Sequence, residues 1–237
     1  MDTKRIGRIF GWFFIATFVT SIPARLLFVD GVGASWSDMR FVAGAGSDTS
    51  LKIGALLEFS LILANIATAV VLYPLVKRQS QILSLGYVTA RVMETVFIAI
   101  GLISIVSVLS VNDALRGASA ADAAALAVQG NTLVSVYDWA FRFGPGLVVG
   151  FGNGLMLGYL MYRSGLVPRR LAMVGLIGGP LLILAFVLVL FGAFDVGSSP
   201  QALLTLPEAA WELLLGIYAA WKGFKHSPTV ESQRAIA

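Results

Sequence analysis

The chain has 237 residues, of which 57% are hydrophobic and only 13% are charged. A soluble domain carries about 25% charged residues, so most of this chain is expected to lie in a lipid bilayer. The lack of cysteine excludes disulfides and thiol chemistry, and we expect no zinc site or cofactor because His226 is the only histidine. The net charge of +4 is spread over short loops and not gathered on one basic face, which does not favour nucleic acid as a partner.

Six apolar segments are each long enough to cross about 30 Å of hydrocarbon. They cover residues 6–28, 52–76, 82–111, 133–162, 171–194 and 206–224, and a polar tail follows over 225–237. We therefore predict an all-α fold, a polytopic transmembrane bundle of six helices that forms one integral membrane domain over 1–237. The first span follows basic residues, as a signal peptide does, but no small-residue cleavage site follows it, so we expect it to be retained.

Lys and Arg are distributed unequally between the loops. Eleven lie before the first span, in the turns after the second and fourth spans, and in the C-terminal tail, whereas the alternate loops hold only Arg40, Lys52 and Arg116. By the positive-inside rule, we expect both termini on the cytoplasmic side of the membrane.

Two of the expected outer loops are long. In the first, residues 30–51, Trp36 and Phe41 suit the level of the lipid headgroups. In the second, residues 112–132, Ser119 and Asp122 have the spacing of a capping box before an alanine-rich run, which predicts a short surface helix. Long outer loops favour a ligand chamber that opens outward, although they can equally be passive lids.

The fourth span carries a repeat of glycines. Gly146, Gly150, Gly154 and Gly158 recur every four residues, so in a helix they form one strip without side chains that suits close helix packing. Pro145 is expected to kink this helix. Broken helices often line transport sites, but kinked helices are also common in bundles without transport. The run GFGNGLMLG follows no strand and is apolar, so it does not indicate a nucleotide site.

Charged and amide side chains interrupt the apolar spans. A charge at the bilayer centre costs about 2.5–3.5 kcal/mol on insertion scales, so such side chains are expected to face the bundle interior and to mark a ligand or ion chamber. The candidates are Arg25, Glu58, Asn65, Arg91, Glu94, Asp138, Arg142 and Glu212. Two pairs lie on one helix face each, Arg91 with Glu94 and Asp138 with Arg142, and are expected to form local ion pairs.

The charges in this set do not balance, because three arginines stand against four carboxylates. At least one carboxylate is therefore expected to be protonated, to bind a cation, or to reach water. We expect a floor formed by Arg91, Glu94, Asp138 and Arg142, and a mouth formed by Arg25, Glu58 and Glu212. Buried ion pairs of this kind can also serve only to hold helices together.

Three hypotheses for function follow from these features. The first is a membrane protein without enzymatic activity that binds or moves a small polar solute or a cation. The second is a structural or accessory subunit that docks a partner helix or a second copy through the glycine face of the fourth span. The third is an enzyme that acts on lipid, with Glu94 as general acid or base.

The segment LMLGYLMYRSGLVPRRLAMVGLIGG, residues 155–179, resembles a family signature. The signature is LGYL-x-YRSG-x-x-PR-x-LG, and the family is an uncharacterised group of bacterial membrane proteins with a conserved domain of unknown function. Similar stretches are LYPLVKR at 72–78, ARVMET at 90–95 and ELLLGIYAAWKGFK at 212–225. The resemblance implies a six-span protein of the bacterial inner membrane and implies no activity. Arg91, Glu94 and Glu212 fall within the matching segments.

Overall fold

The computed structural model describes residues 2–35 and 38–227. Six helices in this part of the chain are long and apolar enough to cross a membrane, which confirms the predicted all-α bundle. The first two spans are α1 (Thr3–Gly31) and α2 (Asp48–Val76). The third span is α3 (Gln81–Val106), which continues as α4 (Val108–Leu115). Trp36 and the tail beyond residue 227 lie outside the described residues.

The fourth span is built from α-helical and π-helical parts. It comprises α5 (Ala120–Phe141), the π-helices η1 (Arg142–Val148) and η2 (Gly150–Leu157), and α6 (Gly158–Ser164). The last two spans are α7 (Arg169–Leu190) and α8 (Ser199–Lys222), which form a hairpin.

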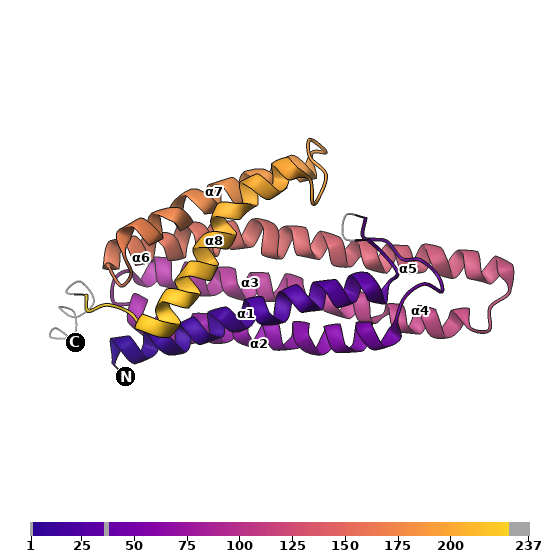
Figure 1. Ribbon diagram of the computed structural model, residues 1–237, viewed down its shortest axis with the longest axis horizontal. Helices are drawn as coiled ribbons and strands as arrows, with labels where there is room; N and C mark the ends of the chain where they lie inside the picture. The colour runs from indigo at the N-terminus through magenta and orange to yellow at the C-terminus, as the bar shows by residue number, and fades with distance from the viewer. Residues whose placement is uncertain (1, 36–37, 228–237) are drawn as a thin grey trace.

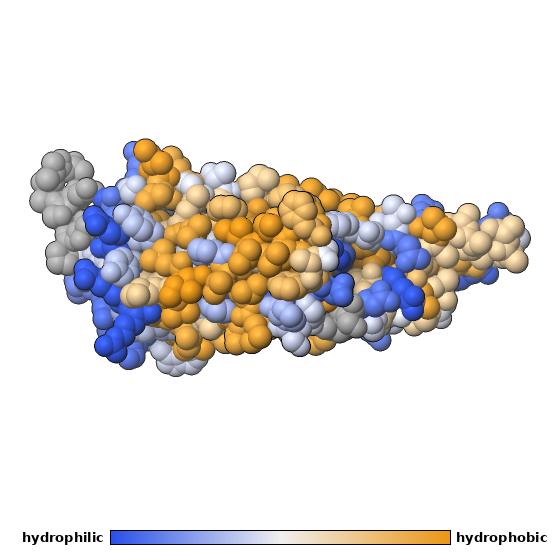
Figure 2. Space-filling model, turned by 90° about the horizontal axis from the view of Figure 1, so that it is seen from above, coloured by the Kyte–Doolittle hydropathy of each residue, from blue (hydrophilic) through white to orange (hydrophobic). Residues whose placement is uncertain are grey.

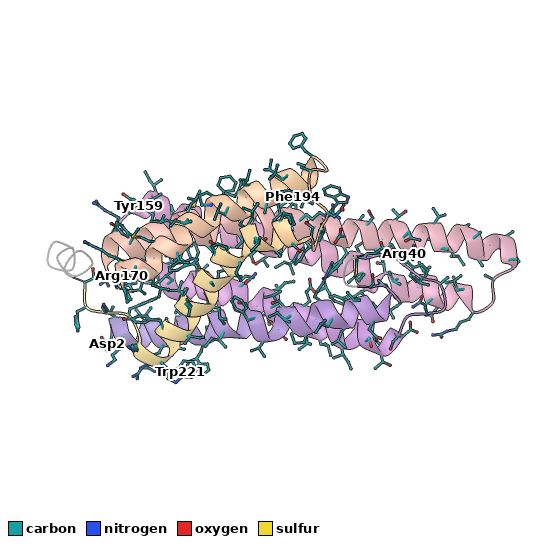
Figure 3. All side chains as sticks on the ribbon, turned by 45° about the horizontal axis from the view of Figure 1, so that its top comes forward. Asp2, Arg40, Tyr159, Arg170, Phe194 and Trp221 are labelled. Carbon is teal, nitrogen blue, oxygen red and sulfur yellow. The ribbon has the colours of Figure 1, made fainter. Side chains whose placement is uncertain are left out.

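Figure 1 shows the first four spans running side by side, with the α7–α8 hairpin laid against them. The start of α1 and the segment that follows α8 lie at one end of the bundle, which we name the terminal end, and we name the opposite end the loop end. Asp2, Arg170 and Trp221 mark the terminal end in Figure 3, whereas Arg40 and Phe194 lie toward the loop end. The hairpin leans away from α1 toward the loop end, so the two parts of the molecule diverge in that direction (Figure 1).

A close contact between α1 and α8 holds the two parts together at the terminal end. A Cβ atom on Gly11 would lie 2.7 Å from the backbone carbonyl carbon of Ala219, and a Cβ on Gly7 would lie 2.9 Å from that of Gly223. These distances are shorter than carbon atoms tolerate, so only glycine permits this approach. The divergence of the hairpin therefore starts from a fixed contact.

The outer surface of the helices is apolar over the middle of the molecule. In Figure 2 a broad hydrophobic region is bounded by hydrophilic residues at the terminal end and again toward the loop end. Leu56 and Ile103 are each 70% exposed and Leu203 is 71% exposed. Such side chains gain nothing from contact with water, so this surface is suited to face lipid tails.

The alanine-rich segment does not form the short surface helix that the sequence predicted. Ser119 caps the helix as expected, since its side chain accepts a hydrogen bond of 3.3 Å from the amide of Asp122. The helix then continues without interruption into the fourth span and reaches Ser164, 45 residues in all. At about 1.5 Å per residue this is about 65 Å, roughly twice the hydrocarbon thickness.

The physical reason for this difference is that alanine and other helix formers fill the start of the segment, and no proline lies between Ala120 and Pro145. Its one glycine before the apolar run, Gly130, packs against the ring of Phe41. Phe41 is 5% exposed, so its ring forms part of the core at this position. Figure 1 shows α4 and the first half of α5 extending beyond α1 and α2 at the loop end.

Pro145 lies within η1, so the expected irregularity of the fourth span takes the form of a π-helix. A π-helix pairs each amide with the carbonyl five residues earlier, and such segments are frequent at functional sites. The four repeated glycines all face α7. In chain order they lie against Phe186, Ile183, Gly179 and Leu176. The glycine strip is thus covered by α7 of the same chain.

Candidate functional site

The middle of the bundle holds a polar cluster centred on Arg91, which is 3% exposed. Its Nη1 donates a hydrogen bond of 2.7 Å to Oε2 of Glu94, and its Nη2 donates to Oδ1 of Asn65 at 2.5 Å and to Oγ1 of Thr68 at 3.2 Å. Asn65 Nδ2 donates to the other Glu94 oxygen at 3.0 Å. The ring of Phe14 covers the guanidinium at 5.5 Å. The charge of Arg91 is therefore neutralised within this cluster.

A second polar cluster lies toward the loop end and is centred on Asp138. Arg25 from α1 contacts one oxygen of this carboxylate at 3.3 Å, and Arg142 from the next helical turn contacts the other. The rings of Tyr137 and Phe141 each lie 5.2 Å from the Arg25 guanidinium. Two cations thus share one carboxylate in this cluster.

The floor and mouth predicted from the sequence are therefore partly wrong. Both local ion pairs form, but Asp138 and Arg142 lie with Arg25 at the loop end and not beside Arg91 and Glu94. The same two residues line an open polar cavity of about 540 Å³, together with Asp195 and other residues of the α7–α8 loop. The reason is that Arg25 of α1 reaches Asp138 from a neighbouring helix, and spacing within one span does not predict such a contact.

A separate, more enclosed cavity of about 220 Å³ lies between the two clusters. Drug-sized ligands occupy pockets of about 300–1,000 Å³, so this space suits a smaller molecule or an ion. Six of the eight candidate residues line it, and we name it the chamber. They are Arg25, Glu58, Asn65, Arg91, Glu94 and Glu212. The remaining lining is largely aromatic and aliphatic and includes Phe14, Phe97, Tyr137, Phe141 and Pro145.

Glu58 is the carboxylate that the rest of the chamber leaves unpaired. It is 7% exposed, and no described residue forms an ion pair or a hydrogen bond with its side chain. Arg25 lines the same chamber, but its ion pair is with Asp138. Glu58 therefore presents a carboxyl group without an ion-pair partner to the chamber.

Glu212 reaches the chamber from α8. Its Oε1 accepts a hydrogen bond from Nδ2 of Asn153 in η2, and it has no ion pair within the described part of the chain. The backbone carbonyl of Asn153 accepts a hydrogen bond of 3.0 Å from the indole of Trp211. The π-helical segment thus positions Asn153 to hold α8 and its carboxylate in place.

The sequence of the chain matches one protein family over most of its length. The sequence model of that family, DUF4386, a domain of unknown function, matches residues 9–223. The chain belongs to the DUF4386 family. No curated protein and no solved structure matches it. For this DUF4386 protein, function has to be argued from the chamber itself.

Some polar residues near the chamber of this DUF4386 protein escaped the prediction from sequence. Asn153 and Thr68 were not among the candidates, although each is a polar residue within an apolar span and each hydrogen-bonds a candidate. Glu208 was not among the candidates either, although it is a charged residue within a span and is only 1% exposed. Among the residues described here, no group of three or more His, Asp or Glu side chains could hold a metal ion.

Proposed function

We propose that this DUF4386 protein binds a small cation, inorganic or a simple organic ammonium ion, in the chamber and passes it across the membrane. The observation that carries the proposal is the pair of carboxylates, Glu58 and Glu212, that face one small cavity without a cationic partner. The two arginines of the chamber are committed to Glu94 and Asp138. A buried charge in a membrane protein normally has a partner, and a bound cation would supply it.

The lining of the chamber also favours a cation. The ring faces of Phe14, Tyr137 and Phe141 already contact arginine guanidinium groups at 5.2–5.5 Å, so the walls attract positive charge. An anion would meet Glu58 and Glu212, whereas both arginines of the chamber already form ion pairs with other carboxylates. The enclosed volume limits the ligand to a small one.

The proposed orientation places both termini in the cytoplasm of a bacterial cell, with the protein in the inner membrane. The distribution of Lys and Arg supports this orientation, because by sequence eleven belong to the side of the termini and three to the alternate loops. The open cavity lined by Arg25, Asp138, Arg142 and Asp195 then faces the outside. A solute would enter from that side and meet the chamber behind it.

The two other hypotheses are less well supported. A docking role through the glycine strip requires a free face, and α7 of the same chain covers that strip. An enzymatic role for Glu94 requires a carboxyl group that can exchange protons with a substrate, and both oxygens of Glu94 are held by Arg91 and Asn65.

The proposal is tested by cation-dependent thermal stability of the purified protein in mild detergent. Sodium, potassium, methylammonium and tetramethylammonium chloride are compared at constant ionic strength. A ligand that binds only the folded state stabilises it by about 2.7 kcal/mol at a hundred times its dissociation constant. We expect at least one of these cations to raise the melting temperature of the wild type and to leave Glu58→Gln unchanged.

Asp113→Asn is the matched control, because it also removes one carboxylate but lies outside the chamber with its side chain 69% exposed. It should keep the cation response of the wild type. Liposomes that contain the protein should then take up the stabilising cation, and those with Glu58→Gln should not. Equal responses of the wild type and Glu58→Gln to every cation would refute the proposal.

A further inference from the structure

Besides the open cavity and the chamber, a cavity of about 240 Å³ lies between the fourth span, α7 and α8. We name it the second cavity. Its polar lining comes from Arg25, Gln201, Thr205, Glu208 and Glu212. Arg25 and Glu212 line the chamber as well, so the two cavities meet at these residues. Glu208 lines only the second cavity and plays no part in the function proposed above.

Glu208 is buried in a way that a charged carboxylate would not tolerate. It is 1% exposed, and neither of its oxygens has a hydrogen-bond partner within residues 2–35 and 38–227. Transfer of an unpaired carboxylate to apolar surroundings costs so much free energy that the group normally takes up a proton instead. A neutral carboxylic acid avoids that cost.

The space for this carboxyl group is made by glycines of two neighbouring helices. A Cβ atom would lie 2.8 Å from Glu208 Oε2 if it were added to Gly178 of α7, and 2.9 Å if it were added to Gly154 of η2. Both distances are too short for a carbon atom, so any side chain at either position would displace the carboxyl group. The fold therefore accommodates an acid at this depth.

The charged groups around Glu208 favour its protonated form. Glu212 lies one turn further along α8, so its negative charge opposes a second one on Glu208. Arg25 from α1 lines the same cavity but forms its ion pair with Asp138. The residues of α7 and of the fourth span that line the cavity are all uncharged.

We propose that Glu208 is a proton-binding site and that its proton is released when a cation binds at Glu212 in the chamber. The bound cation offsets the charge of Glu212, which removes the repulsion that opposes ionisation of Glu208. The O–H bond of Glu208 then breaks, and the proton leaves to water through the second cavity. One positive charge enters as one leaves, so the total charge of the site is unchanged. This linkage rests on the proposed function, but the protonation of Glu208 does not.

Dicyclohexylcarbodiimide tests the site, because it modifies protonated carboxyl groups in apolar surroundings. The purified protein is treated over a range of pH without added cation, and the modified residue is located by mass spectrometry of peptides. We expect modification of Glu208, its loss at high pH, and its absence in Glu208→Gln. In Glu212→Gln, modification should already fall at a lower pH. Glu208→Gln mimics the neutral acid and should keep the wild-type melting temperature, which shows that the variant folds.

The linkage is tested by repeating the modification with methylammonium or sodium, whichever stabilises the wild type. We expect the cation to reduce modification of Glu208, and to release protons detected by a pH-sensitive dye in weakly buffered solution. No proton release should occur in Glu208→Gln, although the cation still stabilises it. No modification of Glu208 at any pH overturns the proton site. Modification that a bound cation leaves unchanged overturns the linkage alone, and failure of every cation to bind overturns the proposed function together with the linkage.

Discussion

The carboxylates of the chamber differ in what surrounds them, and the difference can be measured as stability. Glu94 accepts hydrogen bonds from Arg91 and Asn65, and Arg91 is nearly inaccessible to solvent. Glu94→Gln would leave a buried guanidinium without its counter-charge, which costs about 3–5 kcal/mol. We therefore expect a marked fall in melting temperature in detergent. Asp113→Asn removes an ion pair between side chains that are 69% and 68% exposed and should change stability by about 0–1 kcal/mol. A melting temperature of Glu94→Gln as high as that of the wild type would contradict this account of the Arg91 cluster.

Glu58→Gln should behave in the opposite way. Glu58 has no ion pair among the described residues, so its neutral replacement removes a buried acid without a partner and leaves no arginine without its counter-charge. We expect a melting temperature equal to or above that of the wild type, measured in the absence of the stabilising cation. Functional groups are often retained at such a cost to stability. A fall comparable to that of Glu94→Gln would mean that Glu58 is a structural residue.

Sequence reasoning predicted part of the arrangement of the candidate site, and the reason is local geometry. The pairs Arg91 with Glu94 and Asp138 with Arg142 follow from helical spacing alone. Contacts between helices, such as those of Arg25 with Asp138 and of Asn153 with Glu212, depend on the order and rotation of the spans, which one sequence does not specify. Glu208 was missed for the same reason, because its burial is created by glycines on other helices.

At the scale of helices, the contact between the fourth span and α7 depends on Gly154. A Cβ atom there would meet the backbone of Gly179, and backbone cannot move aside as a flexible side chain can. Gly154→Ala should therefore destabilise the protein by about 1–3 kcal/mol, the usual cost of overpacking. Gly117→Ala is the control, because no atom lies within 4 Å of an added Cβ at that position. The two variants are compared by thermal unfolding in detergent, and equal melting temperatures would refute the proposed packing.

The existence of six helices could be predicted because apolar length is recorded directly in the sequence. The bounds of the fourth span could not. Hydropathy reports where lipid begins, whereas the helix continues to Ala120 because alanine-rich sequence stays helical beyond the bilayer. The π-helical form of residues 142–157 was also missed, since a four-residue glycine spacing gives a continuous face in either kind of helix.

At the scale of the whole molecule, one end is closed and the other is open. Glycine contacts join α1 and α8 at the terminal end, while the α7–α8 hairpin diverges toward the loop end (Figure 1). The open cavity that contains Asp195 lies in this diverging region, and the chamber and the second cavity share Arg25 with it. A solute that enters between the diverging parts would meet Arg25 first and the unpaired carboxylates next. Access to the chamber is thus expected from one side of the membrane.

The side from which the chamber opens can be determined because the chain has no cysteine of its own. Ala124→Cys places one thiol on the exposed surface of α5 at the loop end, and Lys225→Cys places one on the exposed surface at the terminal end. In bacterial spheroplasts, a maleimide that cannot cross membranes should label Ala124→Cys directly. It should label Lys225→Cys only after the membrane is permeabilised, because the basic terminal end is retained in the cytoplasm. The reverse pattern would turn the chamber toward the cytoplasm, and the proposed entry of cations from outside would then be wrong.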